Sequence, residues 1–396
     1  MTDELRQNIV IYQQNGTTFA RGAVDQRLLA EGSASAAIQR ALDAAGSTGG
    51  AEVIISPGKY RLESPLRVPS RTTLRGSGRG SRLDCACTEA EPIGILAKGV
   101  QGACVRDLAV YATSRSQFAG VVLDDAGDSQ IFDIYAQGFG GHGVVVRNNS
   151  FLCEVRGCKL ANNAISGLLM SELTQGGRVG DFLPNLVSNC IAYGGGHGFL
   201  AHHCIVTNFV GCQAFQVNQC GFRIQAVSNS VLISGCRTFK IIGDAVSVDA
   251  SHEFNASSNI FCWHRGRGIV LNDVSWGTIS GNEIIDSGSE MTGGDAAIGV
   301  LLSGFTRGIQ ITGNAIFNWG GQGLMTYGVK EEATCSNNAI VANNFNWWDR
   351  ADILAEGQGT QVANNTGQKS PAYHGTPDGP DPRFSLDAMM AFIQES

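Results

Sequence analysis

The sequence reads His-Gly-Val-Val-Val at residues 142–146 and Ser-Gly-Leu-Leu-Met at residues 166–170, and this phrase returns along the chain. A small or polar residue precedes glycine or alanine, and three or four mostly apolar residues follow. The glycine or alanine stands at positions 143, 167, 198, 221, 245, 268, 299 and 323, so the steps are 24, 31, 23, 24, 23, 31 and 24 residues. A period of 23–24 residues, with two longer insertions, predicts one coil of a solenoid per repeat. We therefore expect an all-β chain, a single-stranded right-handed parallel β-helix of the pectate-lyase-like kind.

Cysteines and asparagines form a second column at a constant phase of the repeat. Its members are Cys158, Cys190, Cys212, Cys236, Asn259, Asn282 and Asn314. Stacked coils lie about 4.8 Å apart, so these side chains should pile up inside the solenoid, with the asparagine amides bonded from coil to coil. We expect the 12 cysteines to be buried thiols rather than disulfides. No Cys-x-x-Cys pair occurs, so we predict no metal site, and nothing in the sequence indicates a cofactor.

Composition excludes several classes of partner. The 396 residues include 52 glycines, only 16% are charged, and the net charge is −7 with no basic run, so we expect no nucleic-acid partner. No apolar run approaches about 18 residues, which predicts no membrane span. The first six residues lack the apolar core of a signal peptide. We expect a cytoplasmic protein, or a secreted one whose leader has been removed.

The ends of the chain differ from the repeats. We expect an N-terminal arm over residues 1–33, the β-helix with its capping helix over 34–365, and a linker with a short helix over 366–396. The capping helix is predicted near residues 33–45, with Ser33 as its N-cap and Gly46 at its end. Residues 51–60 read as the first strand and turn of the solenoid. The final helix is predicted over residues 385–394, after a segment that contains four prolines.

Two polar columns flank the repeated apolar strand and predict a groove for a carbohydrate. One column precedes the glycine or alanine and contains Ser166, His197, Cys220, Asp244 and Arg267. The other follows the strand and contains Arg147, Ser171, His202, Gln225, Asp249 and Asn272. Turn positions are often polar for no functional reason, so a single member carries little weight. Charged and histidine side chains nevertheless cluster between residues 244 and 267.

A pair of carboxylates in this cluster is the first candidate for catalysis. Glycosyl transfer uses one carboxyl group as the acid for the leaving oxygen and another as base or nucleophile. We assign these roles to Asp244 and Glu253, and we expect Arg267, one coil beyond Asp244, to keep that carboxylate ionised. The predicted substrate contacts are His252, His264, Trp263 and Arg265, together with His197, His202, Gln225, Asp249 and Asn272.

Residues 241–285 resemble the inulin fructotransferases and difructose anhydride hydrolases. The resemblance is carried by Gly-Asp-Ala-Val at 243–246, Ser-His-Glu at 251–253 and Arg-Gly-Arg at 265–267. It implies a trimeric right-handed β-helix in which Asp244 and Glu253 act at a fructosyl linkage, by intramolecular transfer or by hydrolysis. The interval of nine residues between the two acids is slightly shorter than the family pattern.

Two other functions fit the same columns. A polyuronide lyase or epimerase needs a base and cations that neutralise the uronate, for which Lys240, Arg265 and Arg267 are candidates. A non-catalytic trimer that binds carbohydrate needs only the regular internal ladders. In all three cases the partner is an oligosaccharide or polysaccharide.

Overall fold

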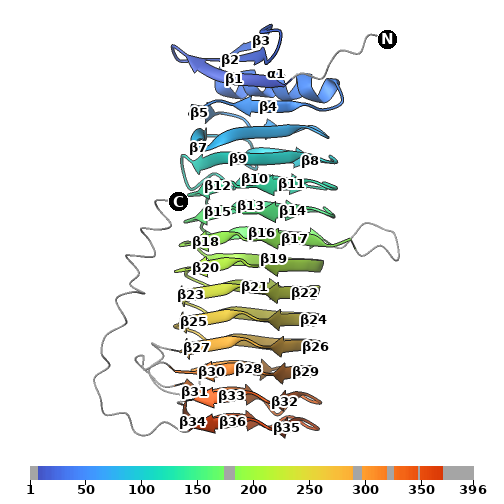
Figure 1. Ribbon diagram of the computed structural model, residues 1–396, viewed down its shortest axis with the longest axis vertical. Coiled ribbons are helices and arrows are strands. Elements are labelled where there is room, and N and C mark those ends of the chain that lie inside the picture. Colours follow the sequence, from blue (N-terminus) through green and yellow to red (C-terminus); the bar gives the residue numbers. More distant parts are fainter. Residues whose placement is uncertain (1–7, 174–182, 289–296, 319–324, 347, 369–396) are drawn as a thin grey trace, which may run out of the picture.

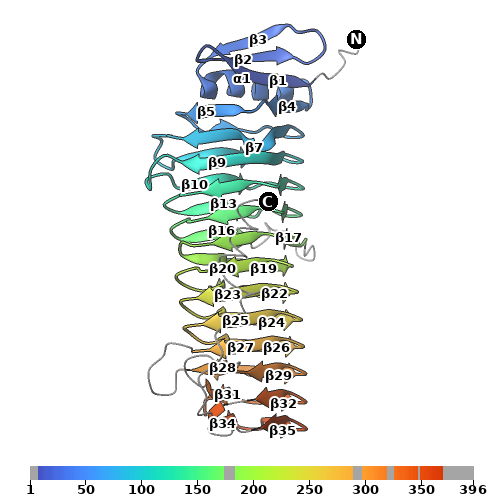
Figure 2. The ribbon, with the colours of Figure 1, turned by 60° about the vertical axis from the view of Figure 1, so that its left-hand side comes forward.

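The computed structural model describes residues 8–173, 183–288, 297–318, 325–346 and 348–368. Parallel strands stack coil upon coil along one axis, so the predicted all-β parallel β-helix is confirmed (Figure 1). Three strands per coil form three long sheets that enclose the core (Figure 2). No helix among the described residues is long and apolar enough to cross a membrane.

The first sheet carries the repeated apolar phrase. Its strands are β6 (Leu66–Arg67), β8 (Ile93–Lys98), β10 (Ala119–Asp124), β13 (His142–Arg147), β16 (Ser166–Leu173), β21 (Phe222–Gln225), β28 (Ile298–Ser303), β31 (Met325–Glu331) and β34 (Trp348–Ala355), with the first parts of β19 (His197–Val210), β24 (Val246–Ser257) and β26 (Ile269–Ser280). Alternate residues of these strands point inward, as the period of two requires. Val144, Leu168 and Val248 are therefore fully buried.

The second and third sheets complete each coil. The second contains β4 (Glu52–Ile55), β11 (Gln130–Phe132), β14 (Glu154–Arg156), β17 (Asn185–Ser188), β22 (Asn229–Ser234), β29 (Arg307–Thr312), β32 (Ala339–Val341), β35 (Gln361–Ala363) and the later parts of β19, β24 and β26. The third contains β5 (Gly58–Leu62), β12 (Tyr135–Gln137), β15 (Lys159–Ala161), β18 (Ile191–Tyr193), β20 (Gln213–Phe215), β23 (Arg237–Ile241), β25 (Ile260–His264), β27 (Glu283–Ser287), β30 (Ala315–Phe317), β33 (Asn344–Asn346) and β36 (Thr366–Gln368). Two long strands, β7 (Thr73–Cys85) and β9 (Cys104–Ala112), serve both sheets.

The predicted internal ladder of cysteines and asparagines is confirmed. The backbone N–H of Cys236 donates to Oδ1 of Asn259 at 2.8 Å, and Nδ2 of Asn259 donates to Oδ1 of Asn282 at 2.8 Å. The amide chain continues through Asn314 to Asn343 and Asn365, two coils farther than predicted. All 12 cysteines are unpaired thiols. The ladder satisfies buried backbone groups at a corner where no sheet hydrogen bond reaches them.

The N-terminal end of the solenoid is closed by a helix and a small antiparallel sheet. Helix α1 (Ala34–Ser47) begins at the predicted N-cap Ser33, whose Oγ accepts from the N–H of Ala36 at 3.5 Å, and ends one residue beyond Gly46. Residues 1–33 are more than the arm that was predicted, because they contain β1 (Ile9–Gln14), β2 (Thr17–Gly22) and β3 (Leu28–Gly32). Strand β1 pairs in parallel with β4, so this sheet covers the first coil (Figure 1). The missed signal is Asn15-Gly16, a typical hairpin turn in which both residues have positive φ.

Three predictions fall outside the described residues. They are the repeat phrase at positions 322–324, the linker from residue 369 onward, and the helix over 385–394.

Replacing Asn282 by alanine should destabilise the solenoid by about 3 kcal/mol or more, because Asn259 and the carbonyl of Ala256 then lose buried partners. Denaturant unfolding followed by circular dichroism measures the change. The exposed neighbour Glu283→Gln is the control and should stay within about 0.5 kcal/mol of the parent. Equal stability of the two variants would contradict a structural role for the ladder.

Candidate functional site

The outer face of the first sheet carries both predicted polar columns. The strand register places His142, Ser166 and His197 on one another at the start of the strands, and Cys220, Asp244 and Arg267 follow in the same register. The other column, which we call the end column, lies at the strand ends and is hydrophilic over nine successive coils. Its members are Lys98, Asp124, Arg147, Ser171, His202, Gln225, Asp249, Asn272 and Ser303.

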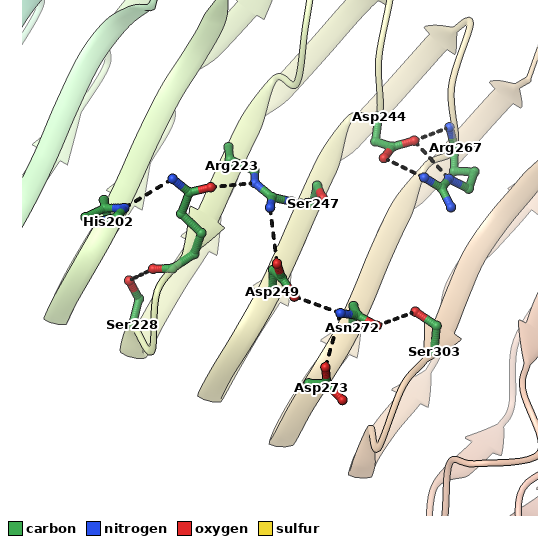
Figure 3. Close-up of polar contacts among 11 residues, drawn as sticks. His202, Arg223, Ser228, Asp244, Ser247, Asp249, Arg267, Asn272, Asp273 and Ser303 are labelled. Carbon is green, nitrogen blue, oxygen red and sulfur yellow. Dashed lines mark hydrogen bonds and ion pairs between the residues drawn. The ribbon is translucent and has the colours of Figure 1, made fainter.

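Hydrogen bonds join the later half of this column into one chain (Figure 3). Gln225 donates to Nδ1 of His202 at 3.1 Å and accepts from Nε of Arg223 at 3.0 Å. The Arg223 guanidinium also contacts Asp249, at 3.4 Å, and Asp249 accepts from Asn272 at 2.7 Å. The predicted residues His202, Gln225, Asp249 and Asn272 are therefore brought together in one connected row.

Among the residues that the structure describes, Arg223 is the only arginine or lysine that contacts the row between His202 and Ser303. It projects outward from β21, and its side chain is 23% exposed. Three of its five N–H groups are engaged, by Gln225, by Ser247 at 2.5 Å and by Asp249. The remaining two have no acceptor among the described residues, and the three protein contacts hold the guanidinium in place.

The contacts of Arg223 also determine which nitrogen of His202 carries a hydrogen. Because the guanidinium can only donate, the oxygen of Gln225 faces Arg223 and its NH2 group faces His202. Nδ1 of His202 must then be unprotonated to accept this bond, and its Nε2 carries the hydrogen. The Nε2–H of His202 faces Glu172, whose Oε1 lies 3.7 Å away, and 41% of the His202 side chain is exposed.

The adjacent His203 has the opposite arrangement. Its Nδ1 lies 2.8 Å from Oε2 of Glu172, which follows the strand end one coil earlier. An ionised carboxylate only accepts, so Nδ1 donates and Nε2 presents a lone pair. A carboxylate that orients a histidine in this way is the arrangement of a general base. Both side chains are exposed by about half, 46% for His203 and 47% for Glu172.

The column at the strand starts is more deeply buried than the end column, and its side chains bond to one another or to the backbone of the next coil. Nδ1 of His142 lies 2.7 Å from the hydroxyl of Ser166, and burial lowers the pKa of His142 to about 4. Burial likewise lowers the pKa of His197 to about 4, and its Nδ1 accepts from the backbone N–H of Cys220. Both histidines are therefore neutral at pH 7. The predicted ligand His197 is engaged by its own column.

Asp244 and Arg267 form the predicted pair across one coil. The carboxylate accepts from the Arg267 backbone N–H at 2.8 Å and from the guanidinium at 3.1 Å through both Nε and Nη2. This ion pair lies apart from the row that contains Asp249 (Figure 3). All these contacts are internal to the protein, and they fasten one strand start to the next.

Glu253 is not brought to Asp244. Asp244 precedes the segment Val246–Asp249 of the first sheet, and Glu253 lies beyond the corner that follows it, where its carboxylate contacts Ser230. The extended backbone from Asp244 to Asp249 alone covers about 16 Å. Two carboxyl groups that act on one glycosidic bond lie roughly 5–9.5 Å apart. Within one chain these two residues do not have the spacing of a catalytic pair.

Several other predicted contacts are corrected by burial or by placement. His264 is fully buried and bonded to the hydroxyl of Thr238 at 2.8 Å, so it cannot reach a sugar. Trp263 lies on the third sheet, where its indole N–H donates to Asp286 and its ring packs on Phe239. His252 is exposed, but it pairs with the second sheet.

The remaining predicted cations also lie apart from Arg223. Arg265 is exposed and follows β25, at the corner that leads to the first sheet. Lys240 is on the third sheet, with its ammonium 5.9 Å from the Trp263 ring centroid.

Glu172 and Arg223 were missing from the predicted catalytic and binding set, and no catalytic role was predicted for His203. Each could have been found from the period of the repeat. Glu172 and His203 each stand one position after a member of the end column, so they fall at the same corner of adjacent coils. Arg223 stands two positions before Gln225, and a period of two places both on one face.

Comparisons with known proteins support the fold. A family model described as a right-handed beta helix region matches residues 142–306, whereas comparison with curated proteins by sequence gave no match. The mannuronan C-5 epimerase AlgE6 A-module of Azotobacter vinelandii has a TM-score of 0.73 and 18% identity, over 86% of this chain and 96% of that one.

Two further solved structures share the fold. The GH87 alpha-1,3-glucanase of Streptomyces thermodiastaticus has a TM-score of 0.57 and 15% identity, over 86% of this chain and 66% of that one. A tailspike protein of E. coli bacteriophage HK620, solved with a pentasaccharide, has a TM-score of 0.56 and 13% identity, over 84% and 62%. The chain is thus a right-handed parallel β-helix protein.

The comparisons gave no inulin fructotransferase, so the resemblance to that family is not supported. The predicted trimer, the carbohydrate partner and the cytoplasmic location stay predictions.

Asp244→Ala should lower the free energy of unfolding by roughly 1–3 kcal/mol, because Arg267 loses a nearly buried acceptor at its backbone N–H and guanidinium. Glu253→Gln, at an exposed corner, should change it by less than about 0.5 kcal/mol. Urea unfolding of both variants tests this contrast. A neutral Asp244→Ala variant would show that the pair does not fasten the coils.

Proposed function

We propose that this protein is a carbohydrate-active enzyme whose substrate is an acidic polysaccharide, and that it acts by proton transfer next to a uronate carboxylate. Epimerisation and elimination both begin with this step. The observation that carries the proposal is the grouping of Arg223 and His202, on the outer face of the first sheet, with the Glu172–His203 pair at the corner that follows, where Glu172 lies 3.7 Å from His202. The similarity in fold to a mannuronan C-5 epimerase supports it over cleavage of a fructosyl linkage.

Removal of a proton from the carbon beside a carboxylate requires a cation that binds this carboxylate, in addition to a base. The hydrogen on the carbon beside a carboxylate is weakly acidic, because its removal adds a second negative charge to the same group. A fixed guanidinium that binds the carboxylate neutralises the first charge and stabilises the one that develops. Arg223 has two N–H groups that no protein acceptor among the described residues engages, and His202 helps to position it through Gln225, which both residues contact.

The Glu172–His203 pair supplies the base. Nε2 of His203 takes the proton from the carbon, and the Glu172 carboxylate stabilises the imidazolium that forms. The electron pair left on the carbon is shared with the carboxylate at Arg223. In epimerisation, a water molecule on the opposite face delivers a proton to the carbon and inverts the centre, and the His203 imidazolium gives its proton back to solvent. In elimination, the bond to the neighbouring glycosidic oxygen breaks as a double bond forms, and the leaving oxygen takes up a proton.

The end column explains why a polymer is the preferred substrate. It presents hydrogen-bonding side chains over nine coils, from Lys98 to Ser303, and a chain that crosses the strands meets a new donor or acceptor about every 4.8 Å. Asp124 and Arg147, joined at 2.9 Å, extend the row beyond the proposed centre.

Arg223→Ala and His203→Ala should each lower kcat at least 100-fold on polymannuronate or polygalacturonate, since one loses charge stabilisation and the other loses the base. Inversion is measured by NMR and elimination by the ultraviolet absorbance of the unsaturated product. Arg307→Ala, an exposed arginine of the second sheet, is the matched control and should keep full activity.

Three results would contradict the proposal. Reducing ends released from a neutral glucan or a fructan, without an unsaturated or inverted product, would identify a hydrolase. Retention of the uronan without any product would identify a binding protein. Full activity of Arg223→Ala would place the reaction elsewhere on the solenoid.

A further inference from the structure

The third sheet carries a patch of tyrosines and cations that plays no part in the proposed reaction. Two outward columns build it near the N-terminal end of the solenoid. One contains Arg82, Ala109, Tyr135 and Lys159, and the other contains Asp84, Tyr111, Gln137, Ala161 and Tyr193. We call these residues, together with Arg79, the tyrosine patch.

The tyrosine rings lie over small residues and are tied together. Ala109 and Ala161 point outward but are fully buried, because Tyr111, Tyr135 and Tyr193 pack around them. Tyr111 and Tyr135 have ring centroids 5.5 Å apart, and the Tyr135 and Tyr193 hydroxyls are 2.9 Å apart. Burial raises the pKa of Tyr135 and Tyr111, so the phenols stay protonated. The result is a preformed aromatic surface that spans several coils.

Two guanidinium groups lie over tyrosine rings of this surface. Arg82 is 4.1 Å from the Tyr111 ring centroid and pairs with Asp84 at 2.6 Å. Arg79 is 4.2 Å from the Tyr135 centroid. Strand β7 is irregular between Arg75 and Arg82, with Gly78 at φ +62°. This irregular stretch lets the Arg79 side chain pass the coil of β9 and contact Tyr135 on the next coil.

Arg79 is exposed, its guanidinium lies over the ring of Tyr135, and its N–H groups have no acceptor in the part of the chain that the structure describes. Its positive charge is close enough to Lys159 to help lower the pKa of that ammonium, after the larger effect of burial. The two guanidinium groups of Arg79 and Arg82 thus lie together with one carboxylate, Asp84, on a protein whose net charge is −7. The local excess of positive charge calls for an anion from outside.

We propose that the tyrosine patch is a second binding site, which takes an acidic glycan through contacts with tyrosine rings and ion pairing. Sugar rings lie against the exposed parts of the half-buried Tyr111 and Tyr193, and a carboxylate binds the N–H groups of the exposed Arg79. The site lies on a different sheet from Arg223 and takes no part in chemistry. It retains the polymer on the protein, so it raises affinity for long chains more than for short ones.

Binding of a galacturonate hexasaccharide to the full chain tests this, with maltohexaose as the neutral probe. The measurement uses isothermal titration on an Arg223→Ala background, which weakens the first-sheet site. In this background Arg79→Ala should weaken binding at least fivefold. Arg237→Ala is the matched control, because Arg237 is an exposed arginine in the same column four coils beyond Tyr135. It should leave affinity unchanged, and maltohexaose should bind at least tenfold more weakly.

Equal affinity of the Arg79→Ala and Arg237→Ala variants would overturn the proposal, as would equal affinity for the neutral hexasaccharide. The outcome is independent of catalysis, because binding is read in a chain that lacks Arg223. If the protein turns over a uronan, Arg79→Ala in the otherwise intact chain should raise KM for the polymer and leave kcat unchanged. A fall in kcat would place Arg79 in the reaction instead.

Discussion

The in-register stacking of coils is the constraint on which the rest of this structure depends. Each coil repeats the hydrogen-bonding positions of the one before it, so residues 23–24 positions apart become neighbours at about 4.8 Å. Inside, this rule builds the asparagine ladder, in which each amide bonds the next and satisfies backbone groups at the corner. Outside, it turns scattered polar residues into continuous columns. A slip of one residue would exchange the inner and outer sets, so the core that fixes the register also fixes the surface.

The period explains why the fold was predictable. The repeated Gly-apolar phrase, the ladder from Cys158 to Asn314 and the N-cap Ser33 are local signals, and each is confirmed. The antiparallel strands β1–β3 were missed because they precede the repeats and pair with one another rather than by the period. The two coils of 31 residues keep the column register, since Ser171 still pairs with His202 and Asn272 with Ser303.

The site was predictable only in part, and the reason is geometric. A period shows which residues share a column, and this placed His202, Gln225, Asp249 and Asn272 together correctly. It does not show how far apart two positions of one coil lie, so Asp244 and Glu253 were paired although a whole strand separates them. Nor does it show depth, which is why His264 was counted as a surface ligand although it is buried against Thr238. The direction of each hydrogen bond, which places the hydrogen of His202 on Nε2 and that of His203 on Nδ1, can be assigned only from the contacts themselves.

The most direct test of this account is a crystal structure of the His203→Ala variant with a bound galacturonate or mannuronate oligosaccharide. The account predicts a saccharide that crosses the strands of the first sheet, with one carboxylate within about 3 Å of the Arg223 guanidinium. An oligosaccharide seated between Asp244 and Glu253, or a first sheet that stays bare while sugar occupies other faces, would contradict it.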